Sequence, residues 1–171
     1  MRIFGFIIML ACGIAFSQSV RYADGTSCEC DSIKKGYHES GALNWETPYV
    51  NGKNHGIAKI YYESGALAWE LPYVNGKEHG ISKGYYESGA LAWEIPFVNG
   101  KRHVITKGYY ESGALAWEIT YVNGEKHGVE KGYYESGALA SEVKYNNGVL
   151  QGYKKCADGR LGNESLDCFE N

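Results

Sequence analysis

The sequence lacks several features that define large classes of proteins. Its net charge is only −3 over 171 residues, with both signs scattered, so it has no basic footprint for nucleic acid. No helical pattern is present that could cover a sheet. A nucleophile elbow, a phosphate-binding loop and a Cys/His dyad are also missing, and near-identical units offer no unique pocket. We therefore expect a protein that is not an enzyme and that uses no cofactor.

A long hydrophobic run is missing as well. The apolar stretch from Ile3 to Phe16 falls short of the roughly 20 residues that a membrane-spanning helix needs. Preceded by Arg2 and followed by Ser17, it resembles a secretory signal peptide over residues 1–19, cleaved near Ser17. An N-terminal anchor helix is the alternative. The sequence around Cys12 loosely resembles a bacterial lipoprotein signal, and lipidation of Cys12 would attach the protein to a membrane. We expect a secreted, periplasmic or cell-envelope protein.

Cysteine is absent from the middle of the chain. Without the signal peptide, Cys28 and Cys30 remain in an N-terminal cap (20–34), and Cys156 and Cys168 in a C-terminal cap (155–171). An even number in an exported chain favours disulfides. Local pairing, Cys156 with Cys168, is expected, because an open sheet of ten strands would hold its ends about 45 Å apart. Cys28 and Cys30 are either paired or free for a partner, and a bond from either to Cys156 would require the sheet to close.

A repeat fills the rest of the chain. The string YYESGALAWE begins at Tyr61, Tyr85 and Tyr109, and near copies begin at Tyr37 and Tyr133. Every copy is offset by 24 residues from the last, so five units run over 35–154 without insertion. A period of this length indicates a solenoid, propeller or array.

Two turn signals divide each unit into a hairpin. Asn-Gly favours a type I′ turn, and Ser-Gly is a second, weaker signal. With Ser64-Gly65 as a two-residue turn, Lys59 lies opposite Glu70, and Tyr62 opposite Leu67. The same rule gives five Lys–Glu pairs and sets a glycine opposite Trp45, Trp93 and Trp117. We predict an all-β fold: an elongated, single-layer antiparallel meander of five 24-residue hairpin repeats, twisted or curled. The register of the Asn-Gly loop, and with it the face on which Ile81 lies, stays open.

Rows of identical residues are the candidate functional groups. The histidine row cannot share a metal, because equivalent positions lie about 9.5 Å apart. Each glutamate of the repeat faces a lysine, which works against an acid role. The aromatic face is either the core of a thin sheet or a stacking platform for a ligand. Its candidate binding residues are Trp45, Trp69, Trp93, Trp117, Tyr62, Tyr86, Tyr110 and Tyr134.

The units resemble the MORN repeat in its bacterial variant form. The resemblance rests on Tyr-Tyr-x-x-Gly-x-Leu, then Glu, Tyr-x-Asn-Gly-Lys and His-Gly, and it covers Lys35 to Tyr153. It implies an elongated twisted sheet of hairpins that acts as an interaction or membrane-associated scaffold. Some bacterial members carry an antitoxin label, which suits a cytoplasmic protein. Departures are Val104 where His-Gly would continue, Ser141 in place of Trp, and Val149 and Gln151 in the last unit.

Together these features predict an exported, non-enzymatic scaffold that binds a protein or cell-envelope partner through its aromatic face. One alternative is a carbohydrate- or cell-wall-binding module that uses the Trp row, since repeated weak sites would give avidity. A second is the antitoxin-type role that the resemblance implies.

Overall fold

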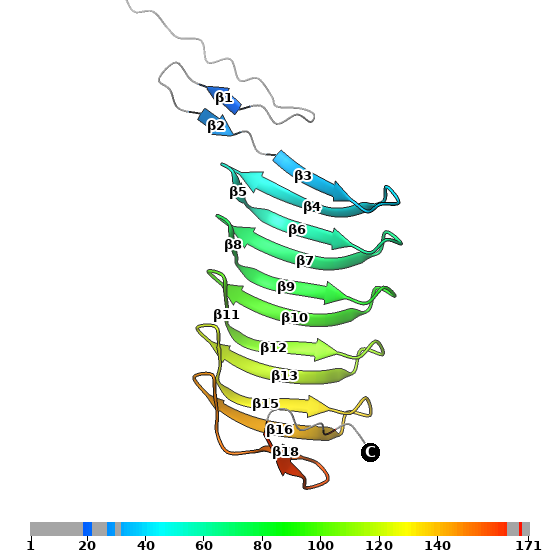
Figure 1. The fold of residues 1–171 in the computed structure, drawn as a ribbon, viewed down its shortest axis with the longest axis vertical. Helices are drawn as coiled ribbons and strands as arrows, with labels where there is room; N and C mark the ends of the chain where they lie inside the picture. Colours follow the sequence, from blue (N-terminus) through cyan, green and yellow to red (C-terminus); the bar gives the residue numbers. More distant parts are fainter. Residues whose placement is uncertain (1–18, 22–26, 30–31, 164–167, 169–171) are drawn as a thin grey trace, which may run out of the picture.

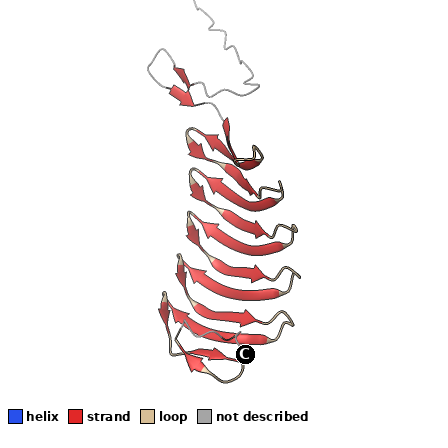
Figure 2. Cartoon of the chain, turned by 45° about the vertical axis from the view of Figure 1, so that its right-hand side comes forward, coloured by secondary structure: helices blue, strands red, loops and turns tan. Residues whose placement is uncertain are grey.

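The computed structural model describes residues 19–21, 27–29, 32–163 and 168. Every regular element in these ranges is a β-strand (Figures 1 and 2). No helix in the described ranges has the length and hydrophobicity needed to cross a bilayer. The predicted cleavage site near Ser17, Cys12 and Cys30 lie outside the described residues, as does the side chain of Cys28.

The strands follow the 24-residue period. Before the repeats come β1 (Ser19–Arg21) and β2 (Ser27–Glu29), which pair with each other. The ten long strands of the repeats are β3 (Ser32–Tyr37), β4 (Leu43–Val50), β6 (Gly56–Tyr61), β7 (Leu67–Val74), β9 (Gly80–Tyr85), β10 (Leu91–Val98), β12 (Val104–Tyr109), β13 (Leu115–Val122), β15 (Gly128–Tyr133) and β16 (Leu139–Asn146). Shorter segments are β5 (Lys53–Asn54), β8 (Lys77–Glu78), β11 (Lys101–Arg102), β14 (Glu125–Lys126), β17 (Val149–Leu150), β18 (Lys154–Cys156) and β19 (Leu161–Gly162).

The long strands form one curved antiparallel sheet in chain order. They stack along the long axis of the molecule, with β3 at one end and β18 at the other (Figure 1). The sheet is open, because no hydrogen-bonded register joins β3 to β18 or β19 among the described strands. This confirms the predicted all-β, single-layer meander of hairpins.

The predicted register holds through the centre of every hairpin. Lys59 lies opposite Glu70 and Ile60 opposite Trp69, and the same pairing recurs in the other four units. The Asn-Gly turns are type I′ as predicted, since Asn75 and Gly76 have φ values of 51° and 82°. Alternating side chains of one strand therefore point to opposite faces of the sheet.

The Ser-Gly turn differs from the prediction. Tyr61, not Tyr62, pairs with Leu67. Tyr62 N–H instead donates to the Ala66 carbonyl at 2.9 Å, and Gly65 N–H donates to the Tyr62 carbonyl at 2.9 Å. This is a three-residue loop whose third position requires Gly65 in the left-handed region, with φ of 87°. A bulge then restores the register before Trp69.

A second irregularity follows each Asn-Gly turn and settles the position of the isoleucine row. Tyr73 pairs with Glu78, whereas Glu70 pairs with Lys83, so two extra residues lie between these pairs on the second strand. A shift of two preserves the side-chain alternation. Ile81 accordingly lies opposite Pro96, away from the tryptophans.

We call the side that carries Trp45, Trp69, Trp93 and Trp117 the Trp face, and the other side the Lys–Glu face. The buried core lies on the Trp face, where Ile119, Tyr121, Val143 and Tyr145 pack together with Leu150 against them. Small buried residues line the same face between the rows: Ala58, Ser82 and Thr106. Curvature of a single layer thus buries the middle of this face without a second layer.

Candidate functional site

The predicted tryptophan row is only partly buried. Trp69 is 43% exposed and Trp117 38% exposed, while Trp45 and Trp93 are in the intermediate range. The indole of Trp93 covers Gly84 on the neighbouring strand, and a Cβ at that glycine would overlap the ring. The rings of Trp69 and Trp93 meet at a centroid distance of 6.2 Å with planes tilted by 59°. The structure therefore brings the tryptophans into one half-open row.

The second tyrosine of each Tyr-Tyr pair connects its unit to the next. Its hydroxyl donates to the backbone carbonyl of the first tyrosine one unit later, at 2.7 Å for Tyr62 to Tyr85. Tyr86 and Tyr110 repeat this contact at 2.6 and 2.7 Å, and Tyr134 donates to the Cys168 carbonyl at 3.1 Å. The four candidate tyrosines thus hold units together through their hydroxyl groups.

The first tyrosine connects its unit to the preceding one. Tyr61 donates to Glu46 at 2.9 Å, and Tyr85, Tyr109 and Tyr133 make the same contact with Glu70, Glu94 and Glu118 at 3.0, 3.1 and 2.8 Å. The Tyr61 hydroxyl, and next Lys35, hold the pKa of Glu46 below its usual value. Burial, and then the bond to Glu118, raises the pKa of Tyr133 to about 12.

The tyrosine–glutamate hydrogen bonds replace most of the charge pairing that was predicted between each glutamate and the lysine opposite. The two residues of each pair lie opposite each other, yet of these five pairs only Lys35–Glu46 forms an ion pair, at 3.3 Å. The other repeat glutamates of the inner units instead accept from a tyrosine of the following unit. A partly buried hydroxyl loses less side-chain entropy when fixed than a long exposed lysine does.

Cationic side chains cover the tyrosines at the other end of the Trp face. Lys34 lies over the Tyr49 ring with its Nζ 4.3 Å from the centroid, and Lys126 lies over Tyr145 at 4.6 Å. Arg102 lies over Tyr121, 5.3 Å from the ring centroid. This face is therefore screened from solvent at one margin and open along the tryptophans.

An exposed aliphatic surface runs along the Lys–Glu face, and the sequence alone did not locate it. We call it the aliphatic band: Ile33, Ile57, Ile81, Ile105 and Val129, with Val74, Val98 and Val122. Pro48, Pro72 and Pro96 lie opposite the first three isoleucines and fill the band between the two rows. Large contiguous apolar patches on soluble proteins commonly mark interaction sites.

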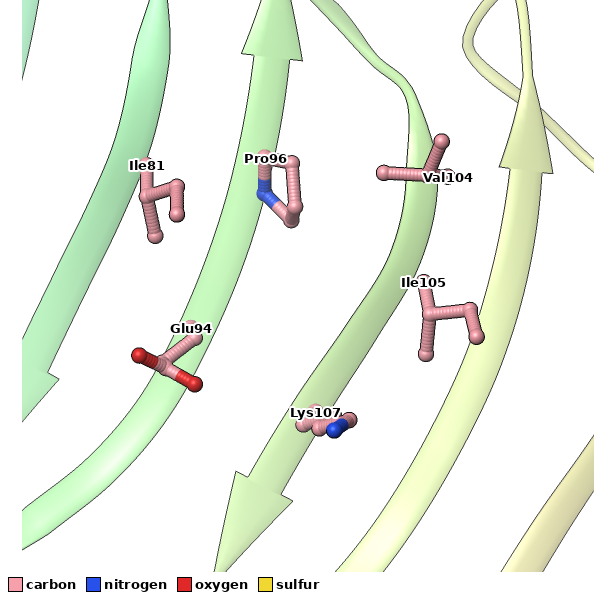
Figure 3. Close-up of a pocket in the computed structure, with 6 residues that line it drawn as sticks. All are labelled: Ile81, Glu94, Pro96, Val104, Ile105 and Lys107. Carbon is pink, nitrogen blue, oxygen red and sulfur yellow. The ribbon is translucent and has the colours of Figure 1, made fainter.

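The band is hollowed at Val104. A shallow, open hollow of about 280 Å³ is lined by Ile81, Glu94, Pro96, Val104, Ile105 and Lys107. Figure 3 shows the Val104 side chain pointing toward Pro96, with Ile81 on the strand beyond. Val104 has φ of 58°, and it is the only residue other than Asn and Gly with positive φ in the described ranges. The equivalent positions 24 residues apart hold Gly56, Gly80, Gly128 and Gly152, each with positive φ, so Val104 adds a side chain where these units have none.

The histidine row lies at the hairpin ends. The backbone N–H of His79 donates to the Pro72 carbonyl at 2.9 Å, and His55, His103 and His127 repeat this bond with Pro48, Pro96 and Thr120. Over the described part of the chain, no group of three His, Cys, Asp or Glu side chains could hold a metal. The predicted Cys156–Cys168 disulfide is present, with a Cα–Cα distance of 5.3 Å.

The period, the type I′ turns and the residue pattern match a known repeat. The model of the MORN repeat variant matches residues 54–75, 78–99 and 126–147. The chain contains three MORN repeats of the variant form. No curated protein matches this sequence.

The MORN matches follow the sheet closely. Each matched segment begins one residue before a His-Gly step and ends at the Asn of the next type I′ turn. The matched segments do not include residues 100–125, where Val104 replaces the glycine. The MORN repeats of this chain thus form a β-sheet scaffold, and the unit that contains Val104 lies between two matched segments.

Proposed function

We propose that the protein is a non-enzymatic scaffold that binds an elongated protein partner, after export to the cell envelope or the exterior. One observation carries this proposal: the aliphatic band stays exposed along the sheet, with Ile57, Ile81 and Ile105 each about half exposed. Burying roughly half of an isoleucine side chain contributes about 1 kcal/mol. Three such contacts in register would favour a partner that lies along the sheet.

The rest of the Lys–Glu face supports a scaffold rather than a reaction centre. Its carboxylates recur every 24 residues in equivalent surroundings, and the inner ones accept hydrogen bonds from tyrosine hydroxyls. Catalysis needs several different groups that converge on one reacting atom. A surface of repeated identical groups instead suits repeated weak contacts with an extended ligand.

A second candidate surface is the half-open tryptophan row, which would serve carbohydrate or another cell-envelope component. The proximity of Trp69 and Trp93, at 6.2 Å between ring centroids, favours it. Adjacent, partly exposed indoles offer apolar faces on which a sugar ring or an apolar chain can stack.

Pull-downs from an envelope fraction with two sets of variants distinguish the surfaces. Ile57→Lys, Ile81→Lys and Ile105→Lys alter the aliphatic band, and Trp69→Ala with Trp117→Ala alters the Trp row. We expect the lysine variants to lose the bound protein while the Trp variants retain it. The opposite pattern would assign binding to the Trp row, and retention by both sets would refute the proposal. Circular dichroism spectra must first show that each variant is folded.

Intrinsic tryptophan fluorescence tests the second candidate directly. Titration with cell-wall glycan fragments should shift the emission if sugars stack on Trp69 or Trp117. An unchanged spectrum at saturating glycan would remove the Trp row as a carbohydrate site. The Ile81→Lys variant is the matched control, since its substitution lies on the other face.

A further inference from the structure

The first strand of the sheet presents an unpaired edge. Among the printed registers of the described strands, β3 pairs with β4 alone and β19 with β18 alone, so the other edge of β3 leaves backbone N–H and C=O groups without strand partners (Figure 1). The opposite end of the sheet is finished differently, by β18, β19 and the Cys156–Cys168 disulfide. An edge of this kind can accept a further strand.

The interior units show which strand that edge would receive. Lys59 lies between two glutamates, Glu46 on one side and Glu70 on the other. Lys35, the equivalent residue of β3, lies opposite Glu46 alone. The edge is therefore missing one carboxylate opposite Lys35.

The glycines and tyrosines also show that β3 lacks a neighbour that the interior strands have. Gly84 lies between Trp69 and Trp93, whereas Gly36 of β3 lies opposite Trp45 alone. The first tyrosine of each later unit donates its hydroxyl to a glutamate of the preceding unit. Tyr37 holds this position in β3, is 62% exposed, and has no acceptor for its hydroxyl among the described residues.

We propose that the outer edge of β3 binds an extended segment of a partner protein as an added antiparallel strand, with an aromatic residue opposite Gly36 and a glutamate opposite Lys35. The glutamate would pair with Lys35 and accept from the Tyr37 hydroxyl, as Glu46 does with Lys59 and Tyr61. The aromatic ring would lie beside Gly36, as Trp69 lies beside Gly84.

No described segment of this chain occupies the outer edge of β3. Continuing the repeat upstream by 24 residues would put Arg21 opposite Gly36 and Tyr22 opposite Lys35, neither of them a carboxylate. Arg21 belongs to β1, which pairs with β2. In a second folded copy, the Trp-Glu sequences lie in β4, β7, β10 and β13, which are paired along both edges. We therefore assign the complement to another protein.

A strand of the repeat provides the probe. A fluorescein-labelled peptide ALAWELPYVN, identical to residues 66–75, should bind the full chain in an anisotropy titration. The peptide ALAWKLPYVN should bind at least tenfold more weakly, because its lysine would face Lys35. Hydrogen exchange should slow at the amides of residues 32–37 when the first peptide binds.

Reversing the charge of Lys35 tests whether this residue pairs with the glutamate of the peptide. Lys35→Glu should reverse the preference, so that the lysine peptide becomes the tighter of the two. Lys155→Glu is the matched control at the other end of the sheet, in β18, and should leave both affinities unchanged. The proposal is overturned if the full chain does not bind the glutamate peptide, if Lys35→Glu keeps the original preference, or if Lys155→Glu shifts it equally.

Discussion

The backbone at Val104 offers a quantitative test of how one altered unit affects the sheet. Its φ of 58° lies in the left-handed region, which costs a β-branched residue about 1–3 kcal/mol. Replacing it with asparagine should relieve most of this cost, because asparagine accepts that conformation, as it does at the five turns with φ between 48° and 54°. Removing the half-exposed Val104 side chain loses about 1 kcal/mol of apolar burial, which partly offsets this gain.

The expected net effect of Val104→Asn is a stabilisation of about 1 kcal/mol, or roughly 3 °C in melting temperature for a chain of this size. The reciprocal change, Gly80→Val, should destabilise by about 1–2 kcal/mol, since it adds left-handed strain. Its Cβ would also lie 3.2 Å from Pro72 Cγ. Thermal melts followed by circular dichroism measure both effects.

A matched substitution isolates the backbone as the cause. Val129→Asn makes the same chemical change on the aliphatic band at a residue without positive φ, and it should not stabilise. Equal melting-temperature shifts for Val104→Asn and Val129→Asn would refute the strain argument. So would a Gly80→Val variant as stable as the parent chain.

Three further predictions test the contacts within the sheet. Gly108→Ala should destabilise by about 1–3 kcal/mol in a urea titration, because the new Cβ would overlap the Trp117 indole; unchanged stability would contradict the close packing. The pKa of Tyr133 is raised from 10.0 to about 12 in the folded protein. The protonated hydroxyl therefore contributes fully to the free energy of unfolding below pH 10, and this contribution is lost as the pH rises through about 12. Melting temperature should therefore fall over that window, and less so in Tyr133→Phe. Reduction of the Cys156–Cys168 bond, which closes a short loop with a sequence separation of 12, should cost about 2–3 kcal/mol, with no effect of reductant on Cys168→Ser.

Much of the fold could be predicted from the sequence, because a single strand register must give favourable residue pairs in all five units. A strand shifted by one residue would move Lys59 away from Glu70 in all five units at once. The Asn-Gly turns need positive φ at both central residues, and few other dipeptides accept it. Length, period and turn chemistry thus agreed on one meander.

The Ser-Gly turn was predicted wrongly for a local reason. Ser-Gly suits a two-residue turn, but Gly65 also suits the third position of a three-residue loop, where one left-handed residue is required. The loop then displaces Tyr61 to face Leu67, and a bulge absorbs the difference. The hydrogen bonds of Tyr62 and Gly65, together with the pairing of Tyr61 with Leu67, distinguish the two loops.

The hydroxyl contacts could not be predicted from spacing at all. In the first three Tyr-Tyr pairs, one hydroxyl donates to a glutamate 15 residues earlier and the other to a carbonyl 23 residues later, as for Tyr85 and Tyr86. Both distances depend on the twist between neighbouring strands, which the sequence pattern does not state. The aliphatic band was missed similarly, because the irregularity after each Asn-Gly turn decides the face of Ile81.

The two ends of the sheet show how a repeat is turned into a terminus. At the C-terminal end, Ser141 takes the tryptophan position and pairs with Cys156, which takes the glycine position of the next unit. The smaller serine, 7% exposed, accompanies a buried disulfide where the inner units hold an indole. Tyr134 correspondingly donates to the Cys168 carbonyl in place of a next tyrosine. At the N-terminal end the repeat pattern instead continues up to the edge, with Lys35, Gly36 and Tyr37 all in place, so this end keeps the chemistry of an interior strand without its neighbour.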